Sequence, residues 1–527
     1  MNWKEANERL SEKRERAVLG GGQEKIEKQH GKGKMTARER LDYLFDEGSF
    51  VEIDAFVESR IDDFEMDRKR APGDGVVVGY GKINGRTVFA ASEDFTVIGG
   101  TLGEYHAAKI CHIQDMAYEN RCPILMINDS GGARIEEGIC SLSGYSGIFL
   151  RNTRASGVIP QIALIMGSCS GGACYGPALC DFIFMVRGNG KMFLTGPQVV
   201  KAVLNEEATM DELGGAQVHE TQSGVAHFVC DSEMQCMDET KRLLSFLPDN
   251  CGNKPPKLPE KVRNSALLRR KGAEQQDRCG ELSSVVPSNS RKVYDVHEVI
   301  KRIADENSCM EVQENFAKNT VVCFVRLDGR AVGVIANQPT RLAGALDCDA
   351  SDKIARFIRT CDCFQIPLIT LIDVPAFFPG KVQEHQGIIR HGAKILYAYS
   401  EAAVPKISLI MRKAYGGAYI AMNSRDMGAD IVYAWPIAEI AVMGAEGAAN
   451  IIFKKKIEAS EQPEEERKRR QKEYSEKFMN PYIAAARGYI TEVIFPEETR
   501  KRLISALDML KNKQVPGIEK RHGNMPL

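Results

Sequence analysis

The sequence predicts an α/β protein made of a duplicated domain. Apolar, strand-like runs alternate with helical stretches through much of the 527 residues. In addition, residues 159–173 read I-P-Q-I-A-L-I-M-G-S-C-S-G-G-A and residues 404–418 read V-P-K-I-S-L-I-M-R-K-A-Y-G-G-A. The two glycine pairs lie 245 residues apart (417 − 172). Both segments begin as a buried strand and end in a glycine turn, so one structural unit is expected twice.

Other landmarks repeat at almost the same spacing. The matched positions are Asn84-Gly85-Arg86 with Asp328-Gly329-Arg330, Gly100 with Gly344, Leu102 with Leu346, Pro123 with Pro367, Asp129 with Asp373, and Thr195-Gly196-Pro197 with Met443-Gly444-Ala445. We therefore expect an N-terminal domain over residues 1–247, a linker over 248–290 and a C-terminal domain over 291–527.

The chain begins with a helical lead-in. Residues 5–18 are charged and amphipathic, and a second helix starts with a capping box formed by Thr36 and Glu39. A β-rich block follows, with turns at residues 72–75 and 84–85. Strands at 124–129 and 162–166 then alternate with helices.

Two later segments have unusual composition. Four prolines between 248 and 259, followed by a charged tract to residue 289, indicate a linker or an interdomain helix. Residues 454–477 are almost wholly charged, with the acidic run 464–466 just before the basic run 467–470. Such an order forms i,i+4 ion pairs on a helix, so it favours a solvated helical insertion over a binding or targeting signal.

Composition excludes several classes of function. A formal net charge of −1 gives no general attraction for nucleic acid, and no apolar run reaches the length of a spanning helix. The polar N-terminus resembles neither a secretory signal nor a transit peptide. Fifteen cysteines without a C-x-x-C motif indicate reduced structural thiols and a cytoplasmic location. No H-E-x-x-H or phosphate-loop motif occurs, and no metal is expected.

The glycine turns are the strongest candidates for chemistry. A strand, a glycine turn and a helix start in that order direct free backbone N–H groups at whatever lies above the turn. The candidate donors for an oxyanion are Gly171 and Gly172, with Ala173 as a third. Alternatively, the small residues only let strand and helix pack closely. Two matching copies favour the first reading and suggest two different oxyanions.

No side-chain base is apparent among the nine histidines. His391 is a candidate for orienting a loop, and Asp129 and Asp373 are expected to be turn or helix-cap residues. The apolar loop 373–380 is either a packing loop or a rigid wall for a flat ligand. Catalysis must therefore use backbone dipoles, or the substrate must supply the base.

Several long strings resemble the acyl-CoA carboxylase carboxyltransferase family. They are Gly73-Asp74-Gly75-Val76-Val77, residues 128–135 (N-D-S-G-G-A-R-I), residues 155–162 (A-S-G-V-I-P-Q-I), Arg390-His391-Gly392-Ala393-Lys394 and Tyr433-Ala434-Trp435-Pro436. The resemblance spans the chain from about residue 10 onward. The family includes the carboxyltransferase subunits of propionyl-CoA carboxylase, methylmalonyl-CoA decarboxylase and transcarboxylase, and residues 350–353 and 428–430 lean toward the last two.

The resemblance implies a fold and a separate binding role for each half. Each half is expected to be a crotonase-like (ClpP-like) ββα superhelix, with acyl-CoA bound by the N-terminal half and biotin by the C-terminal half. The site would lie between one subunit's N-terminal half and its dimer partner's C-terminal half, within a hexamer that is a trimer of dimers. Gly171 and Gly172 would hold the thioester enolate, and Gly417 and Ala418 the ureido oxygen of biotin. Biotin's own nitrogen would serve as the base.

The resemblance also implies further contacts with substrate or biotin. These residues are Ala133, Arg134, Ala173, Tyr175, Phe377, Tyr415, Gly416 and Ile420. Ile420 would line the acyl pocket, where an apolar side chain accepts a methyl or ethyl branch better than a charge. Ala376 and Phe378 depart from the family pattern, as do residues 168–170, Cys174 and Gly176.

The predicted reaction is carboxyl transfer between N1 of biotin and the α-carbon of a short acyl-CoA, with propionyl-CoA and methylmalonyl-CoA the leading pair. Because no Met-Lys-Met biotinylation site occurs, biotin is expected on a separate carrier protein. The further partner would be a biotin carboxylase or a sodium-pumping membrane decarboxylase subunit. Alternatives are another acyl-CoA (acetyl-, butyryl-, methylcrotonyl- or glutaconyl-CoA), a crotonase-type hydratase or isomerase, and a non-catalytic scaffold.

Overall fold

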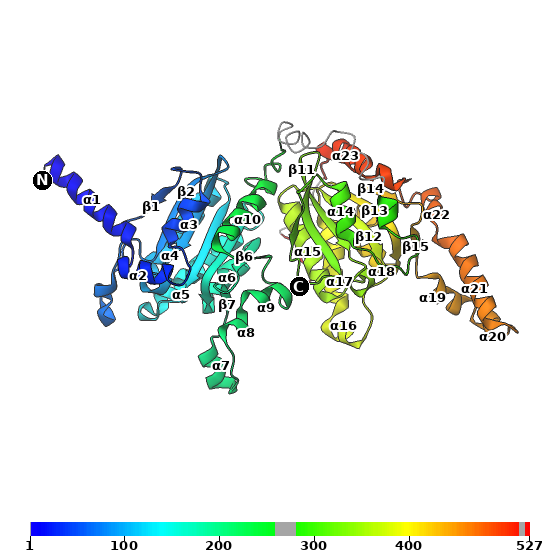
Figure 1. The fold of residues 1–527 in the computed structure, drawn as a ribbon, viewed down its shortest axis with the longest axis horizontal. Coiled ribbons are helices and arrows are strands. Elements are labelled where there is room, and N and C mark those ends of the chain that lie inside the picture. Colours follow the sequence, from blue (N-terminus) through cyan, green and yellow to red (C-terminus); the bar gives the residue numbers. More distant parts are fainter. Residues whose placement is uncertain (1, 259–280, 516–521, 527) are drawn as a thin grey trace. The chain divides into compact units, whose positions relative to one another are not determined.

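The computed structural model describes residues 2–258, 281–515 and 522–526. The chain divides into two compact units, Met1–Lys254 and Pro255–Leu527, each with its own eight-stranded sheet (Figure 1). The division falls inside the segment that composition marks as a linker, and residues 259–280 of that segment lie outside the described residues.

The first sheet runs in the order β1-β2-β3-β4-β5-β6-β8, with β7 paired to β5. It is antiparallel from β1 to β3 and parallel from β3 onward. Its strands are β1 Val51–Ile53, β2 Val76–Ile83, β3 Arg86–Glu93, β4 Ile124–Ser130, β5 Gln161–Ser170, β6 Phe182–Val186, β7 Lys191–Phe193 and β8 Phe228–Cys230.

Helices cover this sheet on both faces. The main helices are α1 Trp3–Leu19, α2 Gln23–His30, α3 Ala37–Leu44, α4 Glu104–Glu119, α5 Ile139–Ala155, α6 Tyr175–Ala178, α7 Pro197–Leu204, α8 Met210–Gly214, α9 Ala216–Thr221 and α10 Glu233–Phe246. Apolar residues of α4 and α5 pack with β2 to β6 into one core. On the opposite face α3 and α10 contact the sheet and each other.

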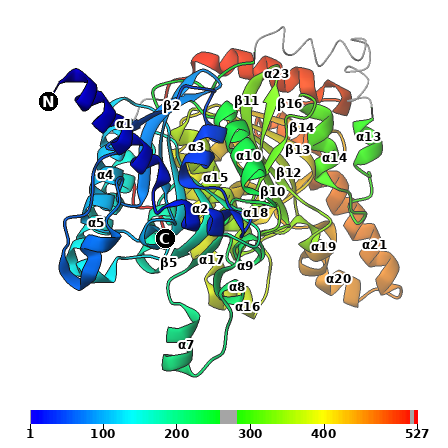
Figure 2. The same ribbon diagram turned by 60° about the vertical axis from the view of Figure 1, so that its left-hand side comes forward.

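The second sheet repeats the first in the order β9-β10-β11-β12-β13-β14-β16, with β15 paired to β13. Its strands are β9 Met310–Val312, β10 Thr320–Leu327, β11 Arg330–Asn337, β12 Leu368–Val374, β13 Lys406–Tyr415, β14 Ile431–Ala434, β15 Glu439–Ala441 and β16 Glu492–Val493. The strands of this sheet and the helices around it are seen from a second side in Figure 2.

The helices of the second unit repeat the plan. They are α13 Leu282–Val285, α14 Val296–Ile303, α15 Cys348–Cys363, α16 Lys381–Gln386, α17 Ile388–Glu401, α18 Gly416–Ala421, α19 Ala445–Ile452, α20 Lys454–Glu458, α21 Pro463–Tyr474, α22 Pro481–Ala486 and α23 Thr499–Met509. Apolar residues of α13, α14 and α23 pack on one face of the sheet, while α15 and α17 pair with each other.

The duplication extends to local details. Helices α4 and α15 are both 16 residues long and start 244 residues apart (348 − 104). The β2–β3 and β10–β11 hairpins turn at Asn84 (φ 51°) and Asp328 (φ 52°), each followed by a glycine. The β4–β5 and β12–β13 pairings both shift register at their carboxyl ends. The predicted repeat and α/β fold are thus present.

Most predicted elements occur, with one difference. Helix α1 covers the lead-in, and α3 starts with the Thr36–Glu39 capping box. The charged segment 454–477 holds α20 and α21, and α21 has no buried residue. Leu282 and Val286, however, are buried in the core of the second unit, so residues from 282 onward pack with that unit and do not link the units.

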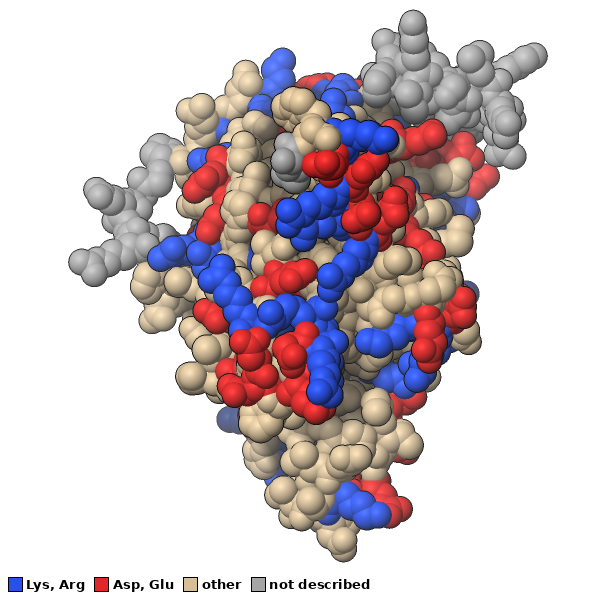
Figure 3. All heavy atoms as spheres, turned by 90° about the vertical axis from the view of Figure 1, so that its left-hand side faces the viewer, with Lys and Arg blue, Asp and Glu red and all other residues tan. Residues whose placement is uncertain are grey.

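The surface carries charges of both signs. On the face shown in Figure 3, Lys and Arg side chains are interspersed with those of Asp and Glu. Among the described residues, none of the helices combines the length and the apolar character needed to cross a membrane.

Candidate functional site

In each unit, one strand of the sheet leads directly into the start of a helix. Strand β5 passes into the 3-10 helix η4 (Gly171–Cys174), and β13 passes into α18. Gly171 (φ 64°) and Gly416 (φ 57°) turn the chain in the left-handed region, which glycine enters without steric cost. The residues that follow each glycine begin a helix. Their N–H groups therefore have no acceptor within that helix.

The two turns match residue by residue. Gly172 and Gly417 are exposed, and Ala173 and Ala418 are buried. The predicted donor pairs Gly171–Gly172 and Gly417–Ala418 are therefore offset by one position. The equivalent of Gly417–Ala418 in the first unit is Gly172–Ala173, which brings the third predicted donor into the matched set.

A buried carboxylate lies at the end of β4 in the first unit. Asp129 accepts hydrogen bonds from Lys34 Nζ at 2.6 Å, Arg40 Nη2 at 3.0 Å and Gln29 Nε2 at 3.1 Å. Arg40 also binds Glu233 at 2.7 Å. The expectation that Asp129 is a turn or cap residue is wrong, because its side chain is fully buried in an ion-pair cluster.

Asp373 holds the same place in the second unit and is likewise not a cap. It accepts from Arg412 Nε at 3.0 Å and from the N–H of Lys413 at 3.1 Å. Arg412 stands where the first unit has Gly167. A Cβ at Gly167 would lie 1.8 Å from Asp129 Oδ1, so glycine leaves the space that Lys34 and Arg40 use.

Two further predicted residues occupy equivalent bridges between loops. Ala133 pairs with Leu102 in the first unit, and Phe377 pairs with Leu346 in the second. The Phe377 ring packs against Gly392 of α17, where a Cβ would approach the ring to 2.9 Å. The Phe377 ring is thus held in place against α17.

Arg134 is engaged inside the protein. Its Nη1 binds Asp74 Oδ1 at 2.9 Å and Glu137 Oε1 at 2.7 Å, and its side chain is 0% exposed. The guanidinium group therefore holds the loop after β4 in place. Any ligand contact of Arg134 falls to its backbone.

Apolar side chains stand exposed next to both turns. Tyr175 is 49% exposed and contacts Phe149 edge-on at 6.0 Å between ring centroids. Ile420 is 46% exposed on α18. Both side chains are therefore accessible from solvent.

A pocket of about 490 Å³ adjoins the second turn and includes Lys413, Tyr415, Glu439 and Gly444 in its lining. The Tyr415 hydroxyl donates to Glu439, and burial raises the pKa of Tyr415. Burial lowers the pKa of Lys413. The volume lies in the range of small-molecule sites, about 300–1,000 Å³.

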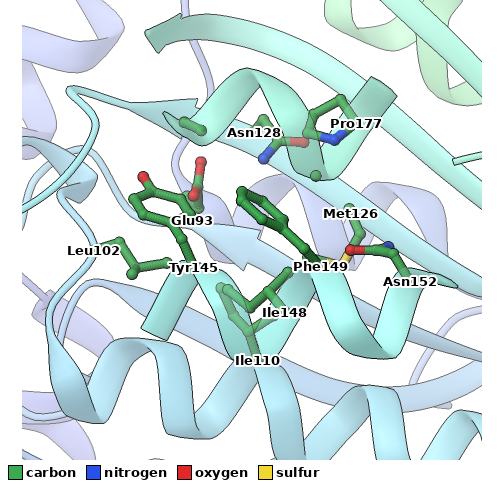
Figure 4. Close-up of a pocket in the computed structure, with 12 residues that line it drawn as sticks. Glu93, Leu102, Ile110, Met126, Asn128, Tyr145, Ile148, Phe149, Asn152 and Pro177 are labelled. Carbon is green, nitrogen blue, oxygen red and sulfur yellow. The ribbon is translucent and has the colours of Figure 1, made fainter. Parts of the chain in front are cut away.

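The first unit has a much smaller cavity of about 20 Å³, whose lining includes one residue of its turn, Ala173 (Figure 4). Its lining includes Glu93, Asn128 and Tyr145, together with Ala173 of the turn and Gly176 of α6. Sequence reasoning did not find Glu93, whose partners are distant in the chain.

His391 does not orient a loop. It lies in α17, and its Nδ1 contacts Asp352 Oδ1 of α15 at 2.8 Å, so it links two helices. Within the described ranges, no group of three or more His, Cys, Asp and Glu side chains is arranged to hold a metal ion.

Residues 28–525 match the carboxyl transferase domain, which covers nearly the whole chain. The chain belongs to the carboxyl transferase family. It is 53% identical to the propionyl-CoA carboxylase carboxyltransferase subunit of Haloferax mediterranei, with all of both chains covered. It is also 53% identical to the methylmalonyl-CoA decarboxylase α subunit of Propionigenium modestum, over 98% of each chain.

Solved structures agree with this assignment. The transcarboxylase 12S hexamer with methylmalonyl-CoA bound is 49% identical, with a TM-score of 0.94 over 100% of this chain and 99% of that one. The predicted family, crotonase-like fold and biotin-dependent carboxyltransferase activity on CoA thioesters are confirmed. The hydratase or isomerase alternative is not favoured.

Proposed function

We propose that the chain moves a carboxyl group between biotin on a separate carrier protein and the α-carbon of a short acyl-CoA, with propionyl-CoA and methylmalonyl-CoA as the leading pair. The relatives named above act on these two thioesters or bind one of them. The observation that supports the proposal is the pair of matched helix starts, because the first N–H groups of a helix have no acceptor within that helix.

In the first unit, the N–H groups of Gly171, Gly172 and Ala173 would stabilise the enolate oxygen of the thioester. Donors fixed before the charge develops need no reorganisation, and one such donor typically contributes about 2.7–4 kcal/mol to the transition state. Tyr175 would contact the acyl-CoA beside the turn, because its ring is exposed there.

In the second unit, Gly417 and Ala418 would donate to the ureido oxygen of biotin. The turn fits this group, because a Cβ built at Gly417 meets no atom within 4 Å. Biotin, when bound, supplies the nitrogen that carries the carboxyl group and accepts the α-proton. Gly416 shapes the turn and Tyr415 precedes it. Phe377 would border the bound biotin, and Ile420 would favour an apolar acyl branch.

We also propose a hexamer, the assembly of the related transcarboxylase 12S. Matching helices after the equivalent Gly196 and Gly444 present apolar residues to solvent, which favours burial against another copy. These exposed residues are Val199, Val203 and Leu204 on α7, and Ile451 and Ile452 on α19. Analytical ultracentrifugation tests the assembly, and a stable monomer would contradict it.

The reaction is tested with purified protein, free biotin and methylmalonyl-CoA. Slow decarboxylation is expected, and it should accelerate with a biotinylated carrier protein. The absence of turnover on malonyl-, methylmalonyl- and glutaconyl-CoA, with and without carrier, would refute the proposal. Whether biotin carboxylase or a sodium-pumping membrane subunit is the further partner is decided by which of them co-purifies.

A further inference from the structure

Glu93 is a buried acid whose equivalent in the second unit is a neutral amide. It ends β3, and its Oε2 accepts the N–H of Asp129 at 2.8 Å. Asn337 ends β11, and its Oδ1 accepts the N–H of Asp373 at 3.2 Å. Each unit thus contains an equivalent hydrogen bond. In both units it lies at the register shift beside the glycine turn.

The Glu93 carboxyl group also faces the cavity of the first unit. Figure 4 shows Glu93 and Tyr145 with their polar ends on the same side of this cavity. The Asn128 side chain also lines this cavity. A volume of about 20 Å³ holds one water molecule, so solvation of a charge there is poor.

The charges around Glu93 are already matched without it. Asp129 on β4 and Glu233 on α10 pair with two cations, Lys34 and Arg40. Tyr145 on α5 and Cys169 on β5 also face Glu93. Burial raises the pKa of Tyr145, and the neighbouring Cys174 thiol, together with burial, raises the pKa of Cys169. An ionised Glu93 would add a third anion to two cations.

Burial raises the pKa of Glu93 to about 8, and the charge of Asp129 contributes to the rise. Both causes favour the protonated form of Glu93 at neutral pH. In that state the carboxyl group keeps the oxygen that accepts from Asp129 and gains one O–H donor. Asn337 has the same pattern, because its Nδ2 donates to the Gly344 carbonyl at 3.1 Å.

We propose that Glu93 is a positioning residue of the first turn that works in its protonated, neutral form, as Asn337 works in the second unit. This inference rests on the proposed function, which assigns the thioester to the first turn. An ionised Glu93 would place a negative charge behind the donors at Gly172 and Ala173. That charge would raise the energy of an enolate held there.

The pH profile of kcat tests the proposal in the full-length protein with methylmalonyl-CoA and carrier-bound biotin. Wild type should lose about tenfold per pH unit above the Glu93 transition. E93A should lose at least tenfold at pH 7, and E93Q should recover most of that loss and lack the alkaline decline. E119Q, which changes an exposed carboxylate of the same unit, should keep the wild-type profile.

The reverse exchange is made in the second unit. N337D should introduce an alkaline decline that the wild-type second unit does not have, because it places an acid beside Asp373. An E93Q profile identical to that of wild type would overturn the proposal.

Infrared difference spectra of wild type minus E93Q at pH 7 give a readout that does not need turnover. A protonated carboxylic acid band is expected, and a carboxylate band in its place would overturn the proposal. If wild type turns over no CoA thioester, the proposed function fails and the infrared result still decides the protonation state.

Discussion

The two units place a carboxylate at the same point and neutralise it in different ways. In the first unit, the cations come from a distant segment: Lys34 precedes α3 and Arg40 lies in it. In the second unit, Arg412 belongs to β13 itself, the strand that leads into the turn. The glycine turn therefore tolerates different interior charge arrangements, provided that the carboxylate is paired.

The largest expected effect comes from removing the cation of the second unit. R412M leaves Asp373 buried without its main partner, which typically costs about 3–5 kcal/mol. K413M should cost far less, because Lys413 Nζ is 3.9 Å from Asp373 Oδ1. Urea titrations of both variants measure the free energy of unfolding. Equal stability of R412M and wild type would show that Arg412 does not neutralise Asp373.

The turns give the next largest effect. G172P and G417P each remove one N–H donor, and each should lower kcat about 10²- to 10³-fold. G172A and G417A are the matched controls, because they keep the N–H and their Cβ atoms have room. A proline variant as active as its alanine control would refute the donor role at that turn.

The repeat can be predicted from the sequence because each repeated feature depends on residues that are close together in the chain. Buried strands, glycine turns and the Thr36 cap depend on neighbouring residues, so period and turn chemistry reveal them. The partners of Asp129 are not local: Lys34 lies 95 residues away and Arg40 lies 89 residues away. No pattern within a strand or helix reports such pairs.

Glu93 was missed for the same reason. Its role becomes visible only through the register of β3 against β4, which brings it to Asp129, and through its match to Asn337. The spacing of 244 residues between the halves (337 − 93) was the one available signal.

A smaller effect is expected from closing the space at Gly167. G167A puts a Cβ against Asp129 Oδ1 and 2.6 Å from Lys34 Nζ, so the ion pairs must shift. Overpacking of this kind typically costs about 1–3 kcal/mol. G176A is the control, because its Cβ would meet only Phe149 at 4.0 Å. Thermal unfolding of the two variants should separate them, and equal midpoints would contradict the account of Gly167.

A further effect concerns a feature that both units share. Lys109 and Lys353 are equivalent buried lysines, and each donates to backbone carbonyls of its own unit. Burial lowers the pKa of each from 10.5 to about 8. Between these values the unfolded chain binds more protons, so the stability contributed by each lysine rises with pH.

Wild type should therefore gain stability relative to K109M or K353M as pH rises from 8 to 10.5. The slope should approach about 1.4 kcal/mol per pH unit for each lysine. Denaturant unfolding at matched pH values measures it. If the stability difference between wild type and variant fell as pH rises, the pKa of these lysines would not be lowered in the folded protein.

The central claim is that the first turn binds the thioester and the second turn binds biotin. Isotope-edited infrared spectroscopy of propionyl-CoA, labelled with ¹³C at its thioester carbonyl, tests this claim most directly. Hydrogen bonds from the first turn should shift this band to lower frequency in wild type and in G417P, and the shift should shrink in G172P. A shift that survives in G172P and disappears in G417P would assign the thioester to the second unit and contradict the account.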